Sequence, residues 1–579
     1  ESLLFATALA VGLSPELLPA IVSVTLSHGA RAMAQRGVIV RRLQAIENLG
    51  SIDTLCTDKT GTLTQGVIQL DAATDPLGRP SDAVRRMGWL NAAFETGIEN
   101  PLDAALIAAG AAAGLSLSGE RKIDEIPYDF IRKRLTIVIE ETAGADRHLM
   151  ITKGAFDNVL AACTRVATDA GEEDLEASVR ERLDAWYRAR GNEGFRVLAV
   201  ATKRVPASPR HSRDDERSMT LAGFLLFFDP PKPGAAQAIA DLQARGIRVR
   251  MITGDNRYVA AHVAGAIGLD ASGMMTGAEI AGLNDESLWY RAGRADLFAE
   301  VDPQQKERIV RALQRTGYLG DGINDAPSLR VADVGISVEG AVDVARESAD
   351  VVMLRPDLDV LRRGVEEGRR TFANTMKYIN ITTSANFGNM VSMALATPLL
   401  PFLPLAAKQI LLNNFLSDIP SAAVSTDNVD PEHVERAQRW NVRDVRRFMV
   451  VFGLASSVFD LLAFAVLLLG FRADQATFQT AWFVVSLLTE LAVVLVLRTT
   501  RPALRSRPGR LLGLSTVVVM VAALCIPYLG PVAAAFGFVP VPPALLAASL
   551  AIVAGYVVFT EVLKLWTHRR RAHAAGSPR

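Results

Sequence analysis

Acidic residues that follow short apolar segments point to phosphoryl chemistry in the middle of the chain. Residues 51–56 read as a buried strand, and Asp58 follows them in a turn rich in Thr and Gly. In doubly wound α/β folds, parallel strands present such turns at one edge of the sheet, so we expect similar turns to meet there. The three strand-and-turn units are residues 51–56 with Thr57-Asp58-Lys59-Thr60-Gly61-Thr62, residues 249–252 with Thr253-Gly254-Asp255, and residues 317–319 with Gly320-Asp321-Gly322-Ile323-Asn324-Asp325.

These residue types suit the transfer of a phosphoryl group to a carboxylate. A carboxylate such as Asp58 can attack phosphorus and form an aspartyl phosphate. Because one anion then approaches another, Mg²⁺ must screen the charges, and Asp58 and Asp321 can hold it. Lys306 can neutralise phosphoryl oxygens, and the Thr253 hydroxyl and the Gly254 N–H can bind one of them. A single acid after a strand is usually a turn or cap residue, but three motifs in this order favour the catalytic interpretation.

The composition predicts a membrane protein. Half of the 579 residues are hydrophobic and only 21% are charged, and the mean hydropathy is +0.21. Lys plus Arg and Asp plus Glu are 62 each, which excludes a dominant basic surface for nucleic acid. Three scattered cysteines exclude a disulfide framework. We expect seven membrane spans, at residues 3–26, 379–400, 404–424, 448–471, 478–497, 511–541 and 543–559.

The basic loops predict how these spans are oriented. Arginines cluster in the loops around residues 443–447 and 498–510 and at 569–571, whereas the alternate loops carry almost no positive charge. This pattern places the large middle block and the C-terminus in the cytoplasm. Residue 1 is then outside, yet no signal peptide or initiator Met precedes it. We therefore expect this chain to be a fragment, with an odd number of spans before residue 1.

The three motifs resemble the signature set of P-type ATPases, the ion pumps that form a phospho-aspartate. The resemblance implies a multi-domain membrane protein in which an α-helical transmembrane bundle carries an α/β haloacid-dehalogenase-like phosphorylation domain. An α+β nucleotide-binding domain is inserted in the latter. The implied boundaries are a transmembrane helix at 1–33, the phosphorylation domain at 34–66 and 229–370, the nucleotide-binding domain at 67–228, and six transmembrane helices at 371–579.

The same resemblance implies roles for single residues. Asp58 would be phosphorylated, and Asp58, the Thr60 carbonyl and Asp321 would bind the catalytic Mg²⁺, with Asp325 close by. The implied catalytic residues are Asp58, Lys59, Thr60, Thr253, Gly254, Asp255, Lys306, Asp321, Asn324 and Asp325. The family's dephosphorylating Thr-Gly-Glu loop, which belongs to an actuator domain, is absent. Ser118-Gly119-Glu120 is similar but falls inside the nucleotide domain, so we interpret it as an ordinary turn and expect the actuator in the complete protein.

The inserted domain carries matches to the family's ATP contacts. Lys153-Gly154-Ala155 resembles the lysine motif beside ATP, and Tyr128 or Phe130 resembles the ring that stacks on adenine. Asp103 and Arg196 resemble the acidic and basic nucleotide contacts. Each also has a structural alternative, because an aromatic residue in a strand is often core and an exposed lysine is often solvated surface.

Oxygen-bearing residues in the spans point to a hard cation. Two prolines flank Glu16 in the first span, where they free backbone carbonyls beside an intramembrane carboxylate. No cysteine lies at this break, and oxygen ligands suit Mg²⁺, Ca²⁺ or Mn²⁺ rather than copper or zinc. Later spans add Asn386, Asn389, Asn413, Asn414 and Asp418. Positions 414 and 418 share a helix face, whereas Asn386 and Asn413 can equally join helices. Asp460 and Glu490 receive no role.

These membrane motifs resemble the bacterial magnesium-transporting subgroup, whose members import Mg²⁺ into the cytoplasm. By that resemblance Glu16, Asn386, Asn389, Asn414 and Asp418 are the candidate ligands of the transported ion. The expected location is the bacterial plasma membrane, and the expected partners are ATP, a divalent cation and the lipid bilayer, but no nucleic acid. Two alternatives stay open. One is the same mechanism for Ca²⁺, Mn²⁺ or H⁺, and the other is a non-pumping remnant that binds nucleotide.

Overall fold

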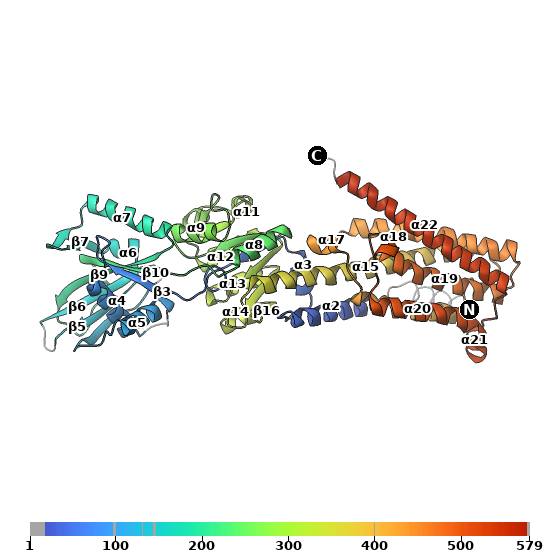
Figure 1. Ribbon diagram of the computed structural model, residues 1–579, viewed down its shortest axis with the longest axis horizontal. Coiled ribbons are helices and arrows are strands. Elements are labelled where there is room, and N and C mark those ends of the chain that lie inside the picture. Colours follow the sequence, from blue (N-terminus) through green and yellow to red (C-terminus); the bar gives the residue numbers. More distant parts are fainter. Residues whose placement is uncertain (1–17, 97–99, 130, 143–145, 399, 576–579) are drawn as a thin grey trace. The chain divides into compact units, whose positions relative to one another are not determined.

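The chain divides into two compact units. A computed structural model describes residues 18–96, 100–129, 131–142, 146–398 and 400–575. One unit comprises Glu1–Ile52 and Val360–Arg579, and the other comprises Asp53–Asp359 (Figure 1). The second unit contains two sheets, each with its own helices, and the first unit is mainly helical.

A parallel sheet in the second unit places the first motif at its centre. Its strands run in the order β16-β15-β14-β2-β11-β13-β12, and every one of these neighbours is parallel. The strands are β2 (Thr54–Thr57), β11 (Arg248–Ile252), β12 (Met275–Thr276), β13 (Leu297–Ala299), β14 (Thr316–Leu319), β15 (Val334–Val338) and β16 (Val351–Met353). The accompanying helices are α8 (Ala235–Ala244), α9 (Arg257–Ala266), α10 (Gly277–Ala281), α11 (Asp285–Ala292), α12 (Pro303–Ala312), α13 (Ala326–Val331) and α14 (Asp343–Ser348).

Strand β2 is buried along its whole length, as expected for a parallel strand covered on both faces. The sequence prediction of a strand from Ser51 was wrong at its start, because helix α3 (Ala45–Ser51) occupies that residue. The N–H of Ile52 donates to the Asn48 carbonyl and ends the helix, and the strand begins at Thr54.

The second sheet of this unit is mostly antiparallel and is inserted in sequence between β2 and β11. Its order is β4-β5-β6-β9-β10-β7-β8, with β3 paired to β10. The strands are β3 (Gln69–Thr74), β4 (Arg121–Ile126), β5 (Arg134–Glu140), β6 (Arg147–Ala155), β7 (Cys163–Thr168), β8 (Gly171–Asp174), β9 (Arg196–Pro206) and β10 (Met219–Phe228). Helices α4 (Asp82–Phe94) and α5 (Pro101–Ala112) share one apolar core with this sheet, and α6 (Phe156–Leu160) and α7 (Ala177–Asn192) share another. Both faces of the sheet are therefore covered.

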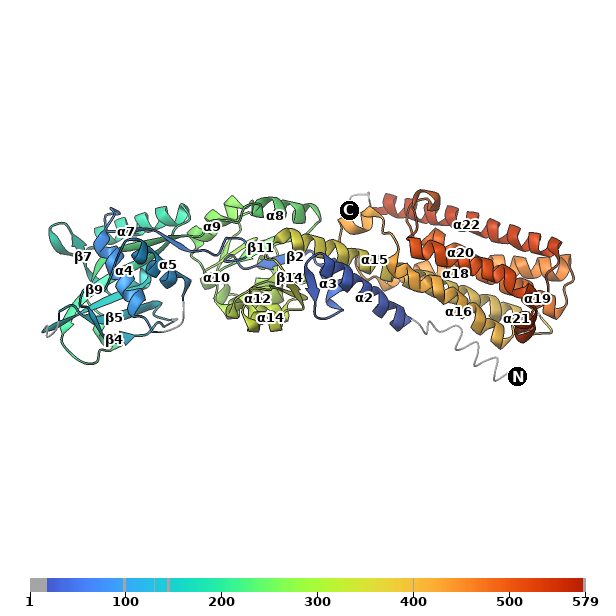
Figure 2. The ribbon, with the colours of Figure 1, turned by 60° about the horizontal axis from the view of Figure 1, so that its bottom comes forward.

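The first unit is a bundle of helices that pack side by side (Figures 1 and 2). Its described elements are α2 (Leu18–Gln35), β1 (Val38–Val40), α3, α15 (Leu358–Ala396), α16 (Ala407–Ala423), α17 (Pro431–Glu435), α18 (Val442–Ala465), α19 (Gln475–Leu497), α20 (Arg510–Cys525), α21 (Gly530–Phe536) and α22 (Pro543–Ala575). One apolar cluster joins Ile410, Phe464, Trp482, Val519 and Leu545, which come from α16, α18, α19, α20 and α22. The bundle therefore has its own core.

Four described helices are long and apolar enough to cross a membrane, namely Val442–Gly470, Gln475–Leu497, Arg510–Tyr528 and Pro543–Arg569. The spans predicted at 379–400 and 404–424 fall on α15 and α16, which are not among these four. The span predicted at 511–541 was too long, because a turn around Pro527 ends that helix and α21 follows separately. Most of the predicted first span lies outside the described residues.

Candidate functional site

The side chain of Asp58 lies at the carboxyl end of the central strand β2. The backbone N–H of Asp58 donates to the Leu319 carbonyl at 3.1 Å, which continues the pairing with β14 into the turn. The N–H of Lys59 donates to Asp58 Oδ1 at 2.9 Å and orients the carboxylate. Lys306, at the start of α12, places its ammonium 3.2 Å from the same oxygen. Asp58 is therefore a fixed carboxylate beside a cation, as a nucleophile for phosphorus requires.

Asp325 anchors the third motif beneath this site. Its carboxylate accepts hydrogen bonds from Tyr318 Oη at 2.6 Å, from Lys306 Nζ at 3.0 Å and from the N–H groups of Asp321 and Gly322. Burial acts to lower the pKa of Lys306, but Asp58 and Asp325 outweigh it and raise that pKa. Lys306 is therefore a permanent cation between two carboxylates.

Burial also raises the pKa of Asp58 to about 6, with the Lys306 charge opposing the rise and the Asp325 charge adding to it. The carboxylate is thus less stable than an exposed one, because it has lost hydration. A desolvated carboxylate is the more reactive form for attack on a phosphoryl group.

The second motif lies on the opposite neighbour of β2. Strand β11 pairs in parallel with β2, and Thr253, Gly254 and Asp255 follow it. The Asp255 N–H donates to Thr253 Oγ1 at 3.1 Å, and Asp255 Oδ2 lies 2.7 Å from Lys59 Nζ. Burial acts to raise the pKa of Asp255, but Lys59 and Arg196 together lower it. Asp255 therefore holds Lys59 in place, and the Gly254 backbone stays exposed for a ligand.

The turns of the first and third motifs suit a hard divalent cation. Thr57 and Leu319 pair in register, so Asp58 and Asp321 follow from adjacent strand ends. Gly61 has φ +73°, and a Cβ there would lie 2.7 Å from Asp321 Oδ2, so the loop approaches this carboxylate closely. Burial and the Asp325 charge raise the pKa of Asp321, as expected where a cation would relieve repulsion. In the described part of the chain no three His, Cys, Asp or Glu side chains form a metal cluster. The residues fit Mg²⁺ only with backbone and ligand oxygens added, which suits an ion that keeps several waters.

Thr60 and Asn324 are the other two predicted catalytic residues. Thr60 lines a cleft with Lys59 and Asp229, and Asn324 is exposed in the short 3₁₀ helix Ile323–Asp325. Both positions leave the side chain available to a ligand.

The sequence prediction missed Asp229 and Lys232. Asp229 follows β10 and accepts hydrogen bonds from Thr64 Oγ1 at 2.6 Å and from the Gly66 N–H at 3.0 Å. Its carboxylate also lies 3.5 Å from Lys59 Nζ. Lys232 donates to the Gly61 carbonyl, and burial lowers the pKa of Lys232 although the nearby Asp321 carboxylate opposes this shift. The sequence pattern that could have indicated Asp229 is an acid at the end of an apolar strand, directly before Pro230-Pro231.

The residues predicted to bind ATP lie at one edge of the inserted sheet. Lys153 on β6 forms a buried ion pair with Asp103 on α5. A Cβ at Gly154 would lie 2.5 Å from Lys133 O and from Arg134 Cβ, so this backbone must pass close to β5. Tyr128 is 50% exposed after β4. Phe130 lies outside the described residues.

Arg196 links the residues predicted to bind ATP to Asp255 of the second motif. It begins β9, and its guanidinium lies 3.3 Å from Asp255 Oδ1. Burial raises the pKa of Tyr128, and the nearby Arg196 opposes this rise. A cleft lined by Asn100, Pro101, Leu102, Arg196, Lys59 and Thr60 runs between the two sets of residues. A triphosphate bound there could therefore reach Asp58 from the inserted domain.

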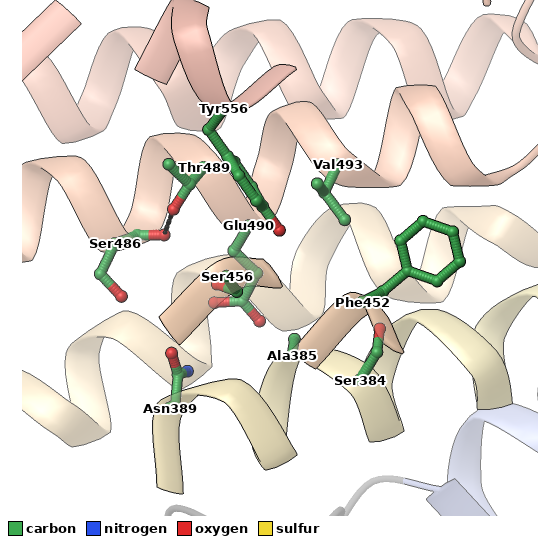
Figure 3. Close-up of a pocket in the computed structure, with 10 residues that line it drawn as sticks. All are labelled: Ser384, Ala385, Asn389, Phe452, Ser456, Ser486, Thr489, Glu490, Val493 and Tyr556. Atoms are coloured by element: carbon green, nitrogen blue, oxygen red, sulfur yellow. Dashed lines mark hydrogen bonds between the residues drawn. The ribbon is translucent and has the colours of Figure 1, made fainter. Parts of the chain in front are cut away.

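A polar pocket lies inside the helical bundle (Figure 3). Asn389 of α15, Glu490 of α19 and Tyr556 of α22 converge on it. The amide of Asn413 on α16 donates to Glu490 Oε2 at 3.4 Å. The other lining residues are Ser384, Ala385, Phe452, Ser456, Ser486, Thr489 and Val493. Carboxylate, amide and hydroxyl oxygens inside the helical bundle suit a hard cation. Glu490 is therefore a candidate ion ligand, although the sequence analysis assigned it no role.

The other predicted ion ligands are Asn386, Asn414, Asp418 and Glu16. Asn386, Asn414 and Asp418 are not among the residues that line this pocket. Asn414 and Asp418 are partly exposed on α16, beside the buried Asn413 and Ser417. Glu16 lies outside the described residues. Asp460 accepts hydrogen bonds from Ser392 Oγ at 2.6 Å and Trp482 Nε1 at 3.3 Å, so it joins three helices.

Comparisons with known proteins agree with this geometry. Residues 91–234 match the family model "P-type ATPase, cytoplasmic domain N", and residues 402–566 match "Cation transporting ATPase, C-terminus". The chain is 44% identical to "Magnesium-transporting ATPase, P-type 1" of Salmonella typhimurium and 43% identical to that of Escherichia coli, over 98% of its own length. It is 30% identical over 90% of its length to "Calcium-transporting ATPase" of Bacillus subtilis.

The chain spans 64% of the length of the two magnesium-transporting relatives. The predicted fold class is confirmed, with a helical membrane unit and two sheet-containing domains. The match extends through the motifs around Asp58, Thr253 and Asp321, which the fold brings to one sheet edge. The chain belongs to the family of P-type ATPases.

Proposed function

We propose that this chain is the catalytic and ion-conducting part of a pump that imports Mg²⁺ into the cytoplasm at the expense of ATP. The observation that carries the proposal is the placement of Asp58. It follows the central strand, contacts Lys306 at 3.2 Å and pairs through its strand with the turn that bears Asp321. This is a site for forming an aspartyl phosphate, in a chain that also holds the acid Glu490 in an intramembrane pocket.

The chemistry follows from the residues in place. A carboxylate oxygen of Asp58 attacks the γ-phosphorus of ATP, an O–P bond forms, and the bond to the bridging oxygen breaks so that ADP leaves with its electron pair. Lys306 and the Thr253–Gly254 turn neutralise and bind the transferred oxygens. Asp58, the Thr60 carbonyl and Asp321, with Asp325 close by, would hold a catalytic Mg²⁺, which supplies charge screening.

The inserted domain delivers the nucleotide. Asp103, Lys153 and Gly154 form one end of its site, and Tyr128 offers a half-exposed ring for the base. Arg196, beside Asp255, is placed to hold the phosphates. The cleft between these residues and Lys59 is the path of the triphosphate.

In the membrane, Glu490 joins Glu16, Asn389, Asn414 and Asp418 as a proposed ligand of the transported ion. Asn389 and Glu490 support this directly, because they line the same pocket. We place the protein in the bacterial plasma membrane with its sheet-containing unit and C-terminus in the cytoplasm, following the basic loops. Dephosphorylation is assigned to an actuator domain of the whole gene product.

The test uses the full-length gene product in proteoliposomes with the cytoplasmic domains facing outward and Mg²⁺ trapped in the lumen. Mg-ATP added outside should drive loss of lumenal Mg²⁺, and Asp58→Asn should abolish it. In parallel, γ-labelled ATP should label the protein in an acid-stable, hydroxylamine-sensitive form that the variant lacks. Labelling without Mg²⁺ movement would support the phosphorylation reaction but reject Mg²⁺ as the transported ion. Absence of both labelling and movement would reject the proposal.

Calcium is the second candidate cargo. The 30% identical relative from Bacillus subtilis is named a calcium-transporting ATPase, and a carboxylate with amide oxygens also suits Ca²⁺. Vesicles loaded with Ca²⁺ or Mn²⁺ distinguish the cations, because only the true cargo leaves in an ATP-dependent manner.

A further inference from the structure

Glu216 is a fully buried carboxylate beside the inserted sheet, and two arginines converge on it. Its side chain is 0% exposed, and Arg132 Nη1 and Arg134 Nε both donate to Glu216 Oε2. Thr136 Oγ1 donates to the other carboxylate oxygen at 2.6 Å. Burying a carboxylate is costly unless it is paired and hydrogen-bonded. Because two cations meet one anion here, Glu216 keeps an ionic partner when either arginine is removed.

This cluster lies on the face of the sheet opposite to the Lys153 side chain. Thr136 pairs with Thr152 across β5 and β6, and their hydroxyl oxygens are 2.7 Å apart. Successive residues of a strand point to opposite faces, so Lys153 points away from this pair and toward Asp103 on α5. Glu216 is therefore separated by the sheet from a nucleotide held beside Lys153, and it can act on that nucleotide through other residues.

Arg132 extends the anchor from Glu216 into the loop that bears Tyr128. This loop joins β4 to β5 over residues 127–133, of which the structure describes all but 130. Arg132 Nη2 donates to the Pro127 carbonyl at 2.6 Å, directly before Tyr128. The Arg132 N–H also donates to the Asp129 carboxylate at 3.1 Å, which closes the turn locally. A guanidinium presents its donors in a rigid fork, so Arg132 ties the backbone beside Tyr128 to a buried point of the sheet.

We propose that Glu216 and Arg132 are positioning residues for the nucleotide, which act by holding the Tyr128 ring in the orientation that stacks on the base. The ring is 50% exposed, and on an unanchored loop it would lose conformational freedom when a base binds. That loss would weaken binding, and the anchor removes it before the nucleotide arrives. The inference rests on the proposed function, since it assumes that Tyr128 contacts the base.

The test is a double-mutant cycle on Arg132 and Tyr128 in the detergent-solubilised full-length protein. Displacement of a fluorescent ATP analogue by ATP gives the dissociation constant of ATP for each variant. Tyr128→Ala should weaken ATP about tenfold, the size expected when one base–aromatic stack is lost. Arg132→Met keeps a long side chain and removes the donors, so it should weaken ATP about fivefold. In the Tyr128→Ala background the same change should cost less than about twofold, because the two residues act as one unit.

Arg134→Met is the matched control. Arg134 donates to the same oxygen of Glu216, but its Nη1 donates to the Asn158 carbonyl on α6 at 2.8 Å rather than to the Tyr128 loop. This variant should keep the ATP affinity within about twofold of the wild type. Arg132→Lys serves if Arg132→Met does not fold. Its single ammonium keeps a charge beside Glu216 but cannot reproduce the fork, so ATP should again bind more weakly.

The outcomes separate the inference from the proposed function. The inference alone is overturned if Tyr128→Ala weakens ATP but both Arg132 variants bind it normally. Equal weakening by Arg132→Met in the two backgrounds, or by Arg132→Met and Arg134→Met alike, would also overturn it, because the arginine would then act on the domain in general. Normal ATP affinity of Tyr128→Ala would instead reject the role of Tyr128 in the proposed function, and the inference with it.

Discussion

Asp229 offers the sharpest test of how the phosphorylation loop is held. Its buried carboxylate accepts from Thr64 Oγ1 at 2.6 Å and from the Gly66 N–H at 3.0 Å, and lies 3.5 Å from Lys59 Nζ. We expect Asp229→Asn to loosen the segment that follows Asp58, because it keeps the shape of the side chain and removes the charge.

The size of the effect follows from these contacts. A hydrogen bond to a charged group contributes ~1.5–3 kcal/mol and a neutral one ~0.5–1.5 kcal/mol, so each of the two bonds loses about 1 kcal/mol. Lys59 keeps Asp255 at 2.7 Å, so the lost ion pair adds little. The free energy of local opening should therefore fall by about 2 kcal/mol, which corresponds to ~30-fold faster exchange.

Amide hydrogen exchange, followed by mass spectrometry of the full-length protein, measures this opening directly. Peptides that contain Leu63, Thr64 and Gly66 should exchange faster in the variant. Asp241→Asn is the control, because the Asp241 carboxylate is exposed on α8, where it accepts a hydrogen bond from Gln237. Unchanged protection of the 63–66 amides in Asp229→Asn would refute the reasoning.

Three further predictions concern other parts of the molecule. Gly61→Ala should abolish phosphoenzyme formation, because φ is +73° and the new Cβ would meet Asp321 Oδ2 at 2.7 Å. Gly114→Ala is the control, because Gly114 has a similar φ of +72° but faces open space. This control should lose only ~1–2 kcal/mol of stability and should still be labelled from ATP. Glu490→Gln should slow Mg²⁺ loss from proteoliposomes about tenfold or more without changing nucleotide displacement, and normal transport would exclude it as a ligand. Glu95→Gln should raise the melting temperature at pH 8 but not at pH 4. Because burial raises the pKa of Glu95 from 4.5 to about 7, its ionisation costs the folded wild type stability as pH rises through this range, and equal shifts at both pH values would contradict this.

The grouping of the three motifs could be predicted because the carboxyl ends of parallel strands all lie at the same edge of a sheet. Asp58, Thr253 and Asp321 each follow a predicted strand, so they lie close together if the three strands are neighbours in the sheet. Strands β11 and β14 do flank β2. The contacts of Asp229 could not be predicted in this way. Asp229 follows β10 of the other sheet and accepts a hydrogen bond from Thr64, which is 165 residues earlier.

Burial in the membrane bundle was harder to predict, because helix rotation decides which polar residue faces a pocket. Asn413 and Asn414 are adjacent in sequence, yet Asn413 is buried and donates to Glu490, whereas Asn414 is partly exposed. The break after Cys525 also escaped the prediction, since the apolar run continues past Pro527 and hides the turn.

The central position of β2 has a consequence for how the chain folds. Thr54 pairs with Arg248 on one side and Thr316 on the other, so β2 must wait for partners that are synthesised much later. The inserted sheet has two apolar cores of its own and is complete once β10 ends at Phe228. During synthesis this insert can form first and bring Thr64 next to Asp229, which shortens the loop that β2 must close. We therefore expect the insert to act as a folding scaffold for the domain that surrounds it.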